Sequence, residues 1–409
     1  MPETAPPVRT APALSERLQT MAPSPTIAAS ARARALAREG KPVLELTVGE
    51  PDFDTPEHIR EAAHKAIRDG KTRYTPSGGI PELKGAVARK LHRENGVEYD
   101  PATEVCICNG GKQALYNVMV ALLNPGDEVI VPVPTWATFA DQVALVGGVP
   151  VLVPMGPDNR LRVADLEGRV TLRTKAVIVN SPSNPTGAVM HPEDVLAITR
   201  FAMAHGIFVV ADDTYEHFLY DGAKHQFSAN GVEGARDWVL AVNTVSKTYA
   251  MTGWRIGYVA GPSRIVKAID ALMTQTTSNP SSIAQWAAVE ALDGPQVCVH
   301  EMVAEFDARR QMFVAGLRSV GYDCPMPEGA FYAYPRIPLQ ADGSPGDSNA
   351  YAMRLLNDAH VSCVGGKAFF DEGTLRMSYA ASRAVLQEVL DRLADLSRSE
   401  EHTSELQSH

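Results

Sequence analysis

Long apolar runs and paired cysteines are both scarce in this chain of 409 residues. No stretch reaches the roughly 18 uncharged apolar residues that a membrane-spanning helix needs, and no apolar block follows a basic start. We therefore expect neither a membrane span nor a secretory signal. The odd number of cysteines, without paired spacing, is typical of a reducing compartment and predicts a cytoplasmic protein. They are Cys106, Cys108, Cys298, Cys324 and Cys363.

Basic residues are also scarce relative to acidic ones: the chain has 38 Lys and Arg and 48 Asp and Glu, which gives a net charge of −10. This balance argues against nucleic-acid binding as the main activity. The chain has neither a G-x-x-x-x-G-K-[ST] loop nor a G-x-G-x-x-G fingerprint, so two common nucleotide sites are excluded. The C-x-C at 106–108 has no second Cys or His pair nearby, and we expect no metal site there.

Short apolar runs alternate with helical patterns from about residue 103 onward. Helix-like stretches such as 112–123 and 192–205 separate these runs. This alternation predicts an α/β fold, in which helices flank a mostly parallel sheet. The length allows a large domain and a smaller α/β domain. The predicted strands are 105–108, 128–133, 175–180, 207–212, 239–244 and 256–261.

We divide the chain into five segments. These are a disordered N-terminus (1–13), an N-terminal arm joining the small domain (14–48), a large cofactor-binding domain (49–292), a small domain (293–397) and a polar tail (398–409). Residues 24–38 are Ala- and Arg-rich, which fits an amphipathic helix better than a transit peptide. The tail RSEEHTSELQSH matches a translated sequencing adapter, so we interpret it as an assembly artefact that leaves the natural C-terminus open.

Four motifs follow predicted strands, where open α/β sheets bind ligands. NGGKQAL (109–115) offers glycines and a helix start to a phosphate, although it is also an ordinary strand-to-helix turn. SPSNPTG (181–187) is a tight turn whose Asn can donate a hydrogen bond. ADDTYEH (211–217) places an acidic residue directly after a buried strand, where it can bind a cationic or donor group of a ligand. The alternative is an aspartate that only caps the local structure. NTVSKTYAMTGWRIGY (243–258) supplies a lysine and an arginine.

Together these motifs supply the parts of a pyridoxal 5′-phosphate site. A lysine after a buried strand is partly desolvated, which lowers its pKa and frees the amine for imine formation, although a solvated lysine is the common case. An Asp for the ring nitrogen, an Arg for the phosphate and a glycine turn complete the set. The candidates are Lys247, Asp212, Tyr215, Asn184 and Arg255.

Over residues 14 to 396 the chain resembles class I pyridoxal-phosphate aminotransferases of fold type I, most of all the bacterial aspartate/prephenate aminotransferase branch. The resemblance implies an enzyme that moves an amino group between an amino acid and a 2-oxo acid. It also implies a homodimer with shared active sites. The motifs that carry it are VGEPDFDTP (48–56), RYTPSGGIPELK (73–84), GGKQAL (110–115), PTW (134–136), NSPSNPTG (180–187), DDTYEH (212–217), SKTYAMTGWRIGY (246–258) and LRMSYA (375–380).

The resemblance also implies a role for each site residue. Lys247 matches the lysine that carries the cofactor and shuttles the α-proton, and Asp212 matches the partner of the pyridine nitrogen. Tyr215 and Asn184 match donors to the cofactor phenolate. The remaining matches are Trp136 for ring stacking, the backbone of Gly111 and Lys112 with Arg255, Ser246 or Thr244 for the phosphate, Tyr74 for the neighbouring subunit's phosphate, and Arg376 beside Gly49 for the substrate α-carboxylate.

Substrate preference is less determined by these motifs. In this branch the lysine of GGK and an arm hydroxyl meet the distal carboxylate, roles that Lys112 and Thr26 can fill. We therefore expect aspartate or glutamate, with 2-oxoglutarate, oxaloacetate or prephenate as the acceptor. PTWATFAD (134–141) departs from the usual PYWVSYPD, which keeps neutral or aromatic amino acids open. β-Elimination, racemisation or decarboxylation on the same fold remains an alternative, as does a non-catalytic regulatory domain, which usually follows a DNA-binding module.

Overall fold

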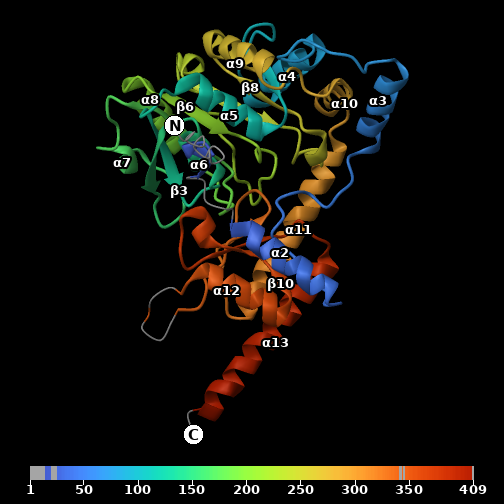
Figure 1. Ribbon diagram of the computed structural model, residues 1–409, viewed down its shortest axis with the longest axis vertical. Coiled ribbons are helices and arrows are strands. Elements are labelled where there is room, and N and C mark those ends of the chain that lie inside the picture. Colours follow the sequence, from blue (N-terminus) through green and yellow to red (C-terminus); the bar gives the residue numbers. More distant parts are fainter. Residues whose placement is uncertain (1–13, 20–24, 340–342, 344–345, 408–409) are drawn as a thin grey trace, which may run out of the picture.

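The computed structural model describes residues 14–19, 25–339, 343 and 346–407. The disordered N-terminus predicted for residues 1–13 lies outside these ranges. In Figure 1 the chain forms a large upper domain and a smaller lower one, and α11 (Val297–Ser319) runs from one toward the other. The terminal helix α13 (Arg383–Gln407) extends away from the lower domain.

A seven-stranded sheet forms the centre of the large domain, in the order β2-β8-β7-β6-β5-β3-β4. The strands from β7 to β4 are parallel to one another. A mostly parallel sheet was predicted from the sequence, and this order confirms it. The strands are β2 (Val105–Cys108), β3 (Glu128–Val133), β4 (Val149–Pro154), β5 (Thr174–Asn180), β6 (Phe208–Asp212), β7 (Val239–Thr244) and β8 (Gly257–Ala260).

Two strands differ from the sequence-based expectation. β8 is antiparallel to both β2 and β7. Its connection from β7 contains only the short turn η2 (Thr252–Trp254), whereas a parallel return needs a crossover that usually includes a helix. β4 was not predicted at all. Its sequence VPVLVP contains two prolines and leaves several side chains exposed, as an edge strand allows.

Alternate residues of each strand face two different helical layers. On one face Cys106, Val129, Ile178 and Val242 pack with α5, α6 and α9. On the other face Ile107, Ile130 and neighbouring apolar side chains pack with α3, α4, α8 and α10. This two-residue period explains why the strands read as continuous apolar runs. The helices are α3 (Glu57–Arg68), α4 (Pro81–Asn95), α5 (Gly111–Leu122), α6 (Thr138–Leu145), α7 (Val163–Leu166), α8 (Pro192–Ala204), α9 (Ser263–Gln275) and α10 (Ser282–Asp293).

The small domain has its own apolar core, built around Phe306, Phe313, Leu375 and Leu390. Its sheets are β1-β10 and β11-β12-β9, and α11 packs against α13. The N-terminal helix α2 lies across this domain beside β10 and β11. The further elements are α1 (Glu16–Gln19), α2 (Pro25–Arg38), β1 (Leu44–Glu45), η1 (Ala235–Asp237), β9 (Tyr332–Ala333), α12 (Ser348–Arg354), η3 (Leu355–Ala359), β10 (Val361–Ser362), β11 (Val364–Gly365), η4 (Gly366–Phe369) and β12 (Leu375–Ser378).

All five cysteines are free thiols in this fold. Cys106 and Cys108 point into the sheet's helical layer, and Cys324 and Cys363 belong to the small-domain core. Cys298, in the first turn of α11, is half-buried. Among the residues that the structure describes, none of the helices is long and apolar enough to cross a membrane.

Candidate active site

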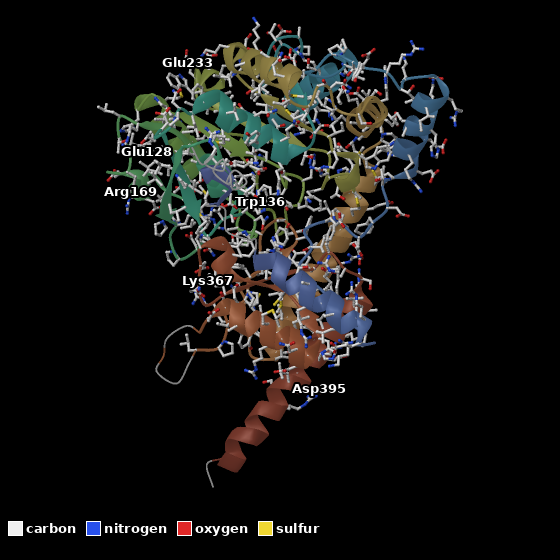
Figure 2. All side chains as sticks on the ribbon, in the orientation of Figure 1. Glu128, Trp136, Arg169, Glu233, Lys367 and Asp395 are labelled. Carbon is white, nitrogen blue, oxygen red and sulfur yellow. The ribbon has the colours of Figure 1, made fainter. Side chains whose placement is uncertain are left out.

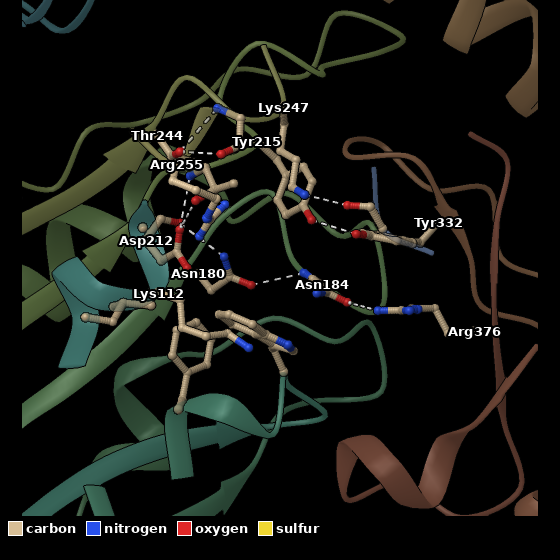
Figure 3. A pocket seen from close by; sticks show the side chains of 17 residues that line it. Lys112, Asn180, Asn184, Asp212, Tyr215, Thr244, Lys247, Arg255, Tyr332 and Arg376 are labelled. Carbon is tan, nitrogen blue, oxygen red and sulfur yellow. Dashed lines mark hydrogen bonds between the residues drawn. The ribbon is translucent and has the colours of Figure 1, made fainter. Parts of the chain in front are cut away.

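The carboxyl ends of three neighbouring parallel strands open into one cavity. β5 ends at Asn180, β6 at Asp212 and β7 at Thr244, and α5 begins beside them at Gly111. The cavity has a volume of about 300 Å³, and Figure 3 shows its side chains pointing inward from both domains. It is lined by Gly49, Gly111, Lys112, Leu115, Trp136, Phe139, Asn180, Asn184, Asp212, Thr214, Tyr215, Thr244, Ser246, Lys247, Arg255, Tyr332 and Arg376.

Asp212 is the buried acid of this cavity. Burial raises the pKa of its carboxyl to about 6, against two hydrogen bonds from Thr214 that lower it. The Thr214 hydroxyl donates to Oδ1 at 2.6 Å and the Thr214 backbone N–H donates to the same oxygen at 3.1 Å. Because a buried carboxylate is stabilised by donors and by cations, this site favours a cationic or N–H-bearing ligand.

Lys247 is the buried amine. Its side chain donates to the backbone carbonyl of Gly49, which connects the turn after β7 to the segment before α3. Burial lowers the pKa of the Lys247 ammonium to about 8, while Glu50 opposes the change and Arg255 adds to it. A lysine with this pKa is roughly one-tenth neutral at pH 7, far more than an ordinary lysine, and the neutral amine can act as a nucleophile or a base.

Arg376 reaches the cavity from β12 of the small domain. Its guanidinium lies between two rings, 4.8 Å from the centre of Tyr332 and 5.0 Å from that of Phe369. It donates to Asn184 Oδ1 at 3.0 Å and to the Thr47 carbonyl at 2.6 Å. Its buried Nε has no hydrogen-bond partner within the described chain. A planar cation held in this way fits a carboxylate.

A group of donors surrounds the start of α5. Thr244 and Ser246 exchange a hydroxyl hydrogen bond of 2.7 Å. Arg255 adopts a left-handed backbone conformation and lies against Gly110, where an added Cβ would be 2.3 Å from its Nη2. The first N–H groups of a helix lack partners inside the helix, so hydroxyls, a guanidinium and free amides converge here. This donor set fits a phosphate.

Lys112 and Trp136 lie together at another wall of the cavity. The Lys112 ammonium is 4.8 Å from the centre of the Trp136 ring. Burial and the nearby Arg255 lower the pKa of Lys112, and Asp141 in α6 raises it. Figure 2 places Trp136 at the level where the two domains meet, far from Glu233 at the outer end of the large domain. A cation at this wall of the cavity favours an anionic group on the ligand.

Two predicted site residues do not join this cavity. The side chain of Tyr74 is 91% exposed and does not line the cavity. Thr26 belongs to α2, but its side chain lies outside the described part of the structure. All other predicted site residues line the cavity.

The sequence reasoning missed several lining residues, above all Tyr332, Thr214 and Asn180. The Tyr332 hydroxyl lies 2.6 Å from that of Tyr215. Burial raises the pKa of both phenols, so both stay protonated. Asn180 donates to the Asp212 carbonyl at 3.1 Å and accepts from the Asn184 N–H at 3.0 Å. Thr214 belongs to the DDTYEH motif, where only its neighbours were given roles.

Comparison with known proteins agrees with this arrangement. The sequence profile described as aminotransferase class I and II matches residues 41–393. The chain belongs to this family. It is therefore an enzyme, a transaminase, as predicted from its motifs.

Relatives of this aminotransferase match along nearly its whole length. An aspartate/prephenate aminotransferase from Cereibacter sphaeroides is 46% identical, covering 93% of this chain and 97% of that protein. An aspartate aminotransferase from Geobacillus stearothermophilus is 42% identical, covering 93% and 98%. The crystal structure of the Rhizobium meliloti aspartate aminotransferase has a TM-score of 0.90 at 42% identity, covering 95% of this chain and 99% of that one.

Proposed function

We propose that this aminotransferase binds pyridoxal 5′-phosphate in the cavity and uses it to transfer the amino group of a dicarboxylic amino acid to a 2-oxo acid. The observation that carries the proposal is the convergence of Lys247, Asp212 and Arg376 on one space of about 300 Å³. An amine of lowered pKa, a buried carboxylate and a guanidinium with an unpartnered Nε fit the aldehyde, the ring nitrogen and a carboxylate, respectively.

The residues divide the work of holding the cofactor. Lys247 would carry it, and Asp212 would pair with its ring nitrogen. Tyr215 and Asn184 would donate to its phenolate oxygen, and Trp136 would cover its ring. The backbone N–H groups of Gly111 and Lys112, together with Thr244, Ser246 and Arg255, would hold its phosphate at the start of α5.

The chemistry needs a proton to leave the substrate α-carbon and return elsewhere. When bound, the cofactor supplies an electron sink for the carbon that loses this proton. The Lys247 amine is the base placed to take the proton, because burial leaves it partly neutral near pH 7. Arg376 orients the substrate by its α-carboxylate, with Gly49 beside it.

Lys112 is the residue that would select a dicarboxylic substrate. Its ammonium has the Trp136 ring beside it, and a distal carboxylate would be a better partner. A neutral side chain would leave this cation unpaired, which disfavours it. Relatives named aspartate and aspartate/prephenate aminotransferases support aspartate or glutamate as donor and 2-oxoglutarate, oxaloacetate or prephenate as acceptor. The Thr26 hydroxyl is our proposed second contact.

One observation favours neutral or aromatic amino acids as a second candidate. The Lys112 ammonium already lies against the Trp136 ring, and the nearby Asp141 carboxylate favours its charged form. Its charge is therefore partly stabilised without a substrate. An aromatic aminotransferase from Pyrococcus horikoshii has a TM-score of 0.85 at 39% identity, covering 91% of this chain and 99% of that one.

Half-reactions of the purified enzyme with a panel of amino acids separate these candidates. Loss of the absorbance of the Lys247-bound cofactor reports amino transfer, and release of ammonia or carbon dioxide reports elimination or decarboxylation instead. We expect aspartate and glutamate to react fastest. Lys112→Met should lower kcat/KM for them about a hundredfold while sparing a neutral substrate, and Lys112→Arg should retain the preference. A wild-type preference for neutral amino acids would overturn the dicarboxylate assignment.

We also propose a homodimer with shared active sites in the cytoplasm. Tyr74 is highly exposed on its own chain, which fits a residue that reaches the phosphate of a neighbouring subunit. Arg255 lines both the cavity and an adjoining surface groove with Asp54 and Trp254, which offers a route for such an approach. The five free thiols fit a reducing compartment.

A further inference from the structure

The turn after β6 contains a hydroxyl that the assignment of site residues leaves without a role. Thr214 lines the cavity and is half-buried. Its Oγ1 donates to Asp212 Oδ1 at 2.6 Å, and its backbone N–H donates to the same oxygen at 3.1 Å. No other side-chain donor reaches the Asp212 carboxylate within the described residues. The two bonds therefore fix one carboxylate oxygen and leave Oδ2 for a ligand.

We propose that Thr214 is a positioning residue that holds the Asp212 carboxylate ionised and turned so that its second oxygen meets the ring nitrogen of pyridoxal phosphate. This inference deepens the proposed function and rests on it. A carboxylate on a short side chain can rotate between oxygens, and a hydroxyl that binds one oxygen selects one rotamer. Thr214 acts through Asp212 and need not touch the reacting atoms.

The electrostatics around Asp212 show why a donor is needed here. Burial raises the pKa of Asp212, and the neighbouring carboxyl of Asp213 raises it further. Lys247, in the turn after β7, lowers the pKa of Asp212, but Thr214 supplies the larger opposing effect through its side-chain and backbone hydrogen bonds. The phenol of Tyr215 also lies near Asp212, and its raised pKa keeps it neutral.

An alternative role for the hydroxyl would be to bind the cofactor phosphate. Thr214 Oγ1 lies 4.0 Å from the position that a Cβ on Gly111 would occupy, so the start of α5 is close. The two roles differ in which part of the cofactor they need. A hydroxyl that acts through Asp212 affects the binding only of a cofactor whose ring contains a nitrogen. A hydroxyl on the phosphate matters for every phosphorylated analogue.

The test uses two probes and three variants of the full chain stripped of cofactor. The probes are pyridoxal phosphate and its 1-deaza analogue, in which a C–H group replaces the ring nitrogen. Thr214→Val removes the hydroxyl at nearly constant shape, and Thr214→Ser restores it. Thr199→Val is the matched control, because it removes a buried threonine hydroxyl that bonds only backbone carbonyls in and beside α8. Dissociation constants are measured by equilibrium dialysis from pH 5 to 8.

We expect Thr214→Val to lower the affinity for pyridoxal phosphate about tenfold at pH 7, which is the effect of losing one hydrogen bond to a charged group. The affinity for the deaza analogue should not change. The fall in pyridoxal phosphate affinity at low pH should move upward by about one pH unit, because a donor that favours the ionised Asp212 is gone. Thr214→Ser should restore both properties, and Thr199→Val should change neither.

Equal losses for the two probes in Thr214→Val would overturn the inference in favour of the phosphate role or a general disturbance. An unchanged affinity for pyridoxal phosphate would overturn it as well. A wild-type chain that fails to bind pyridoxal phosphate would instead refute the proposed function, so the two failures are distinguishable.

Discussion

Two ionisable side chains of the cavity owe their chemistry to burial. Lys247 becomes a weaker base and Asp212 a weaker acid than the free amino acids, since each charged form loses hydration. The same cavity also supplies partners that restrain these changes, namely Glu50 for the lysine and Thr214 for the aspartate. The pKa of Lys247 and the pKa of Asp212 should therefore each produce their own pH dependence, in different steps of the reaction.

Attachment of pyridoxal phosphate to Lys247 should accelerate with pH up to about 8 and then level off. The neutral amine is the nucleophile, and its fraction rises about tenfold per pH unit below the pKa of about 8. Stopped-flow absorbance of the cofactor-free chain measures this rate. Lys247→Ala should abolish attachment and turnover, whereas Lys267→Ala, at an exposed position of α9, should change neither. A rate that still climbs at pH 10 would contradict the lowered pKa.

Asp212→Asn should reduce kcat by about a hundredfold to a thousandfold, the loss typical of removing one key electrostatic group. Asp213→Asn is the matched control, because Asp213 is fully buried but faces His225 instead of the cavity. Burial raises the pKa of Asp213, and His225 opposes this. The control should therefore lower the melting temperature and largely spare kcat. Similar kinetic losses at the two positions would mean that the acid has been misassigned.

At the residue scale, the positions of the motifs predicted which residues reach the cavity better than which side chains they contact there. Asp212 ends β6 and Lys247 follows β7, so their arrival at one sheet edge could be foreseen. Arg376 comes from β12 in the separate sheet of the small domain, and only the family resemblance placed it at the site. The rings that flank Arg376 could not, because Tyr332 and Phe369 come from other elements and no local spacing connects them. Which partner a side chain finds depends on tertiary packing.

At the scale of elements, the turn from β2 into α5 combines two requirements. Gly110 has a φ of +82°, which L side chains rarely adopt, and it makes room for the Arg255 guanidinium. Gly110→Ala should displace Arg255 and weaken binding of pyridoxal phosphate by roughly a hundredfold, as the loss of a charged phosphate contact plus backbone strain implies. Equilibrium dialysis measures this affinity.

Gly168→Ala provides the control for strain alone. Gly168 has a φ of +72° but no atom within 4 Å of an added Cβ. It should cost stability without changing cofactor affinity. If both alanine variants bound pyridoxal phosphate as the wild type does, the contact between Gly110 and Arg255 would have no part in phosphate binding.

Strand prediction succeeded where strands are buried on both faces, including β2 at one edge of the sheet, and failed at the exposed edge strand β4. The inner strands read as continuous apolar runs and appear with nearly the predicted bounds. β4 lies at the edge, where exposed positions and prolines remove the apolar signal. The direction of β8 depends on the connection after β7, and the apolar pattern of a strand contains no information about direction.

Helix α13 extends through the tail that we interpret as adapter-derived. Among the side chains of this helix that the structure describes, the last buried one is Leu393. Removing residues 398–409 should therefore leave the melting temperature and activity unchanged. Leu390→Ala, in the same helix, should cost about 2–5 kcal/mol because it opens a cavity beside Gly316. Thermal unfolding compares the two variants. A marked drop after truncation would refute the artefact interpretation.

At the scale of the whole molecule, the proposed dimer predicts complementation between two inactive chains. Lys247→Ala lacks the amine, and Tyr74→Ala lacks the residue proposed to reach the neighbouring phosphate. A mixed dimer would hold one site with an intact Lys247 and the partner's intact Tyr74. Refolding the two variants together should therefore recover activity that neither shows alone. No recovery in a confirmed mixed dimer would show that Tyr74 serves its own chain.

The uneven burial of the cysteines makes this enzyme suitable for site-specific labelling. Cys106, Cys108, Cys324 and Cys363 are enclosed by apolar side chains, whereas the thiol of Cys298 is half-buried at the start of α11. A maleimide dye should therefore attach at Cys298 in the native chain and reach the others only after denaturation. Because Cys298 packs against the large-domain core at the start of α11, a dye there would mark the large-domain end of the helix that runs toward the small domain, without any engineered cysteine.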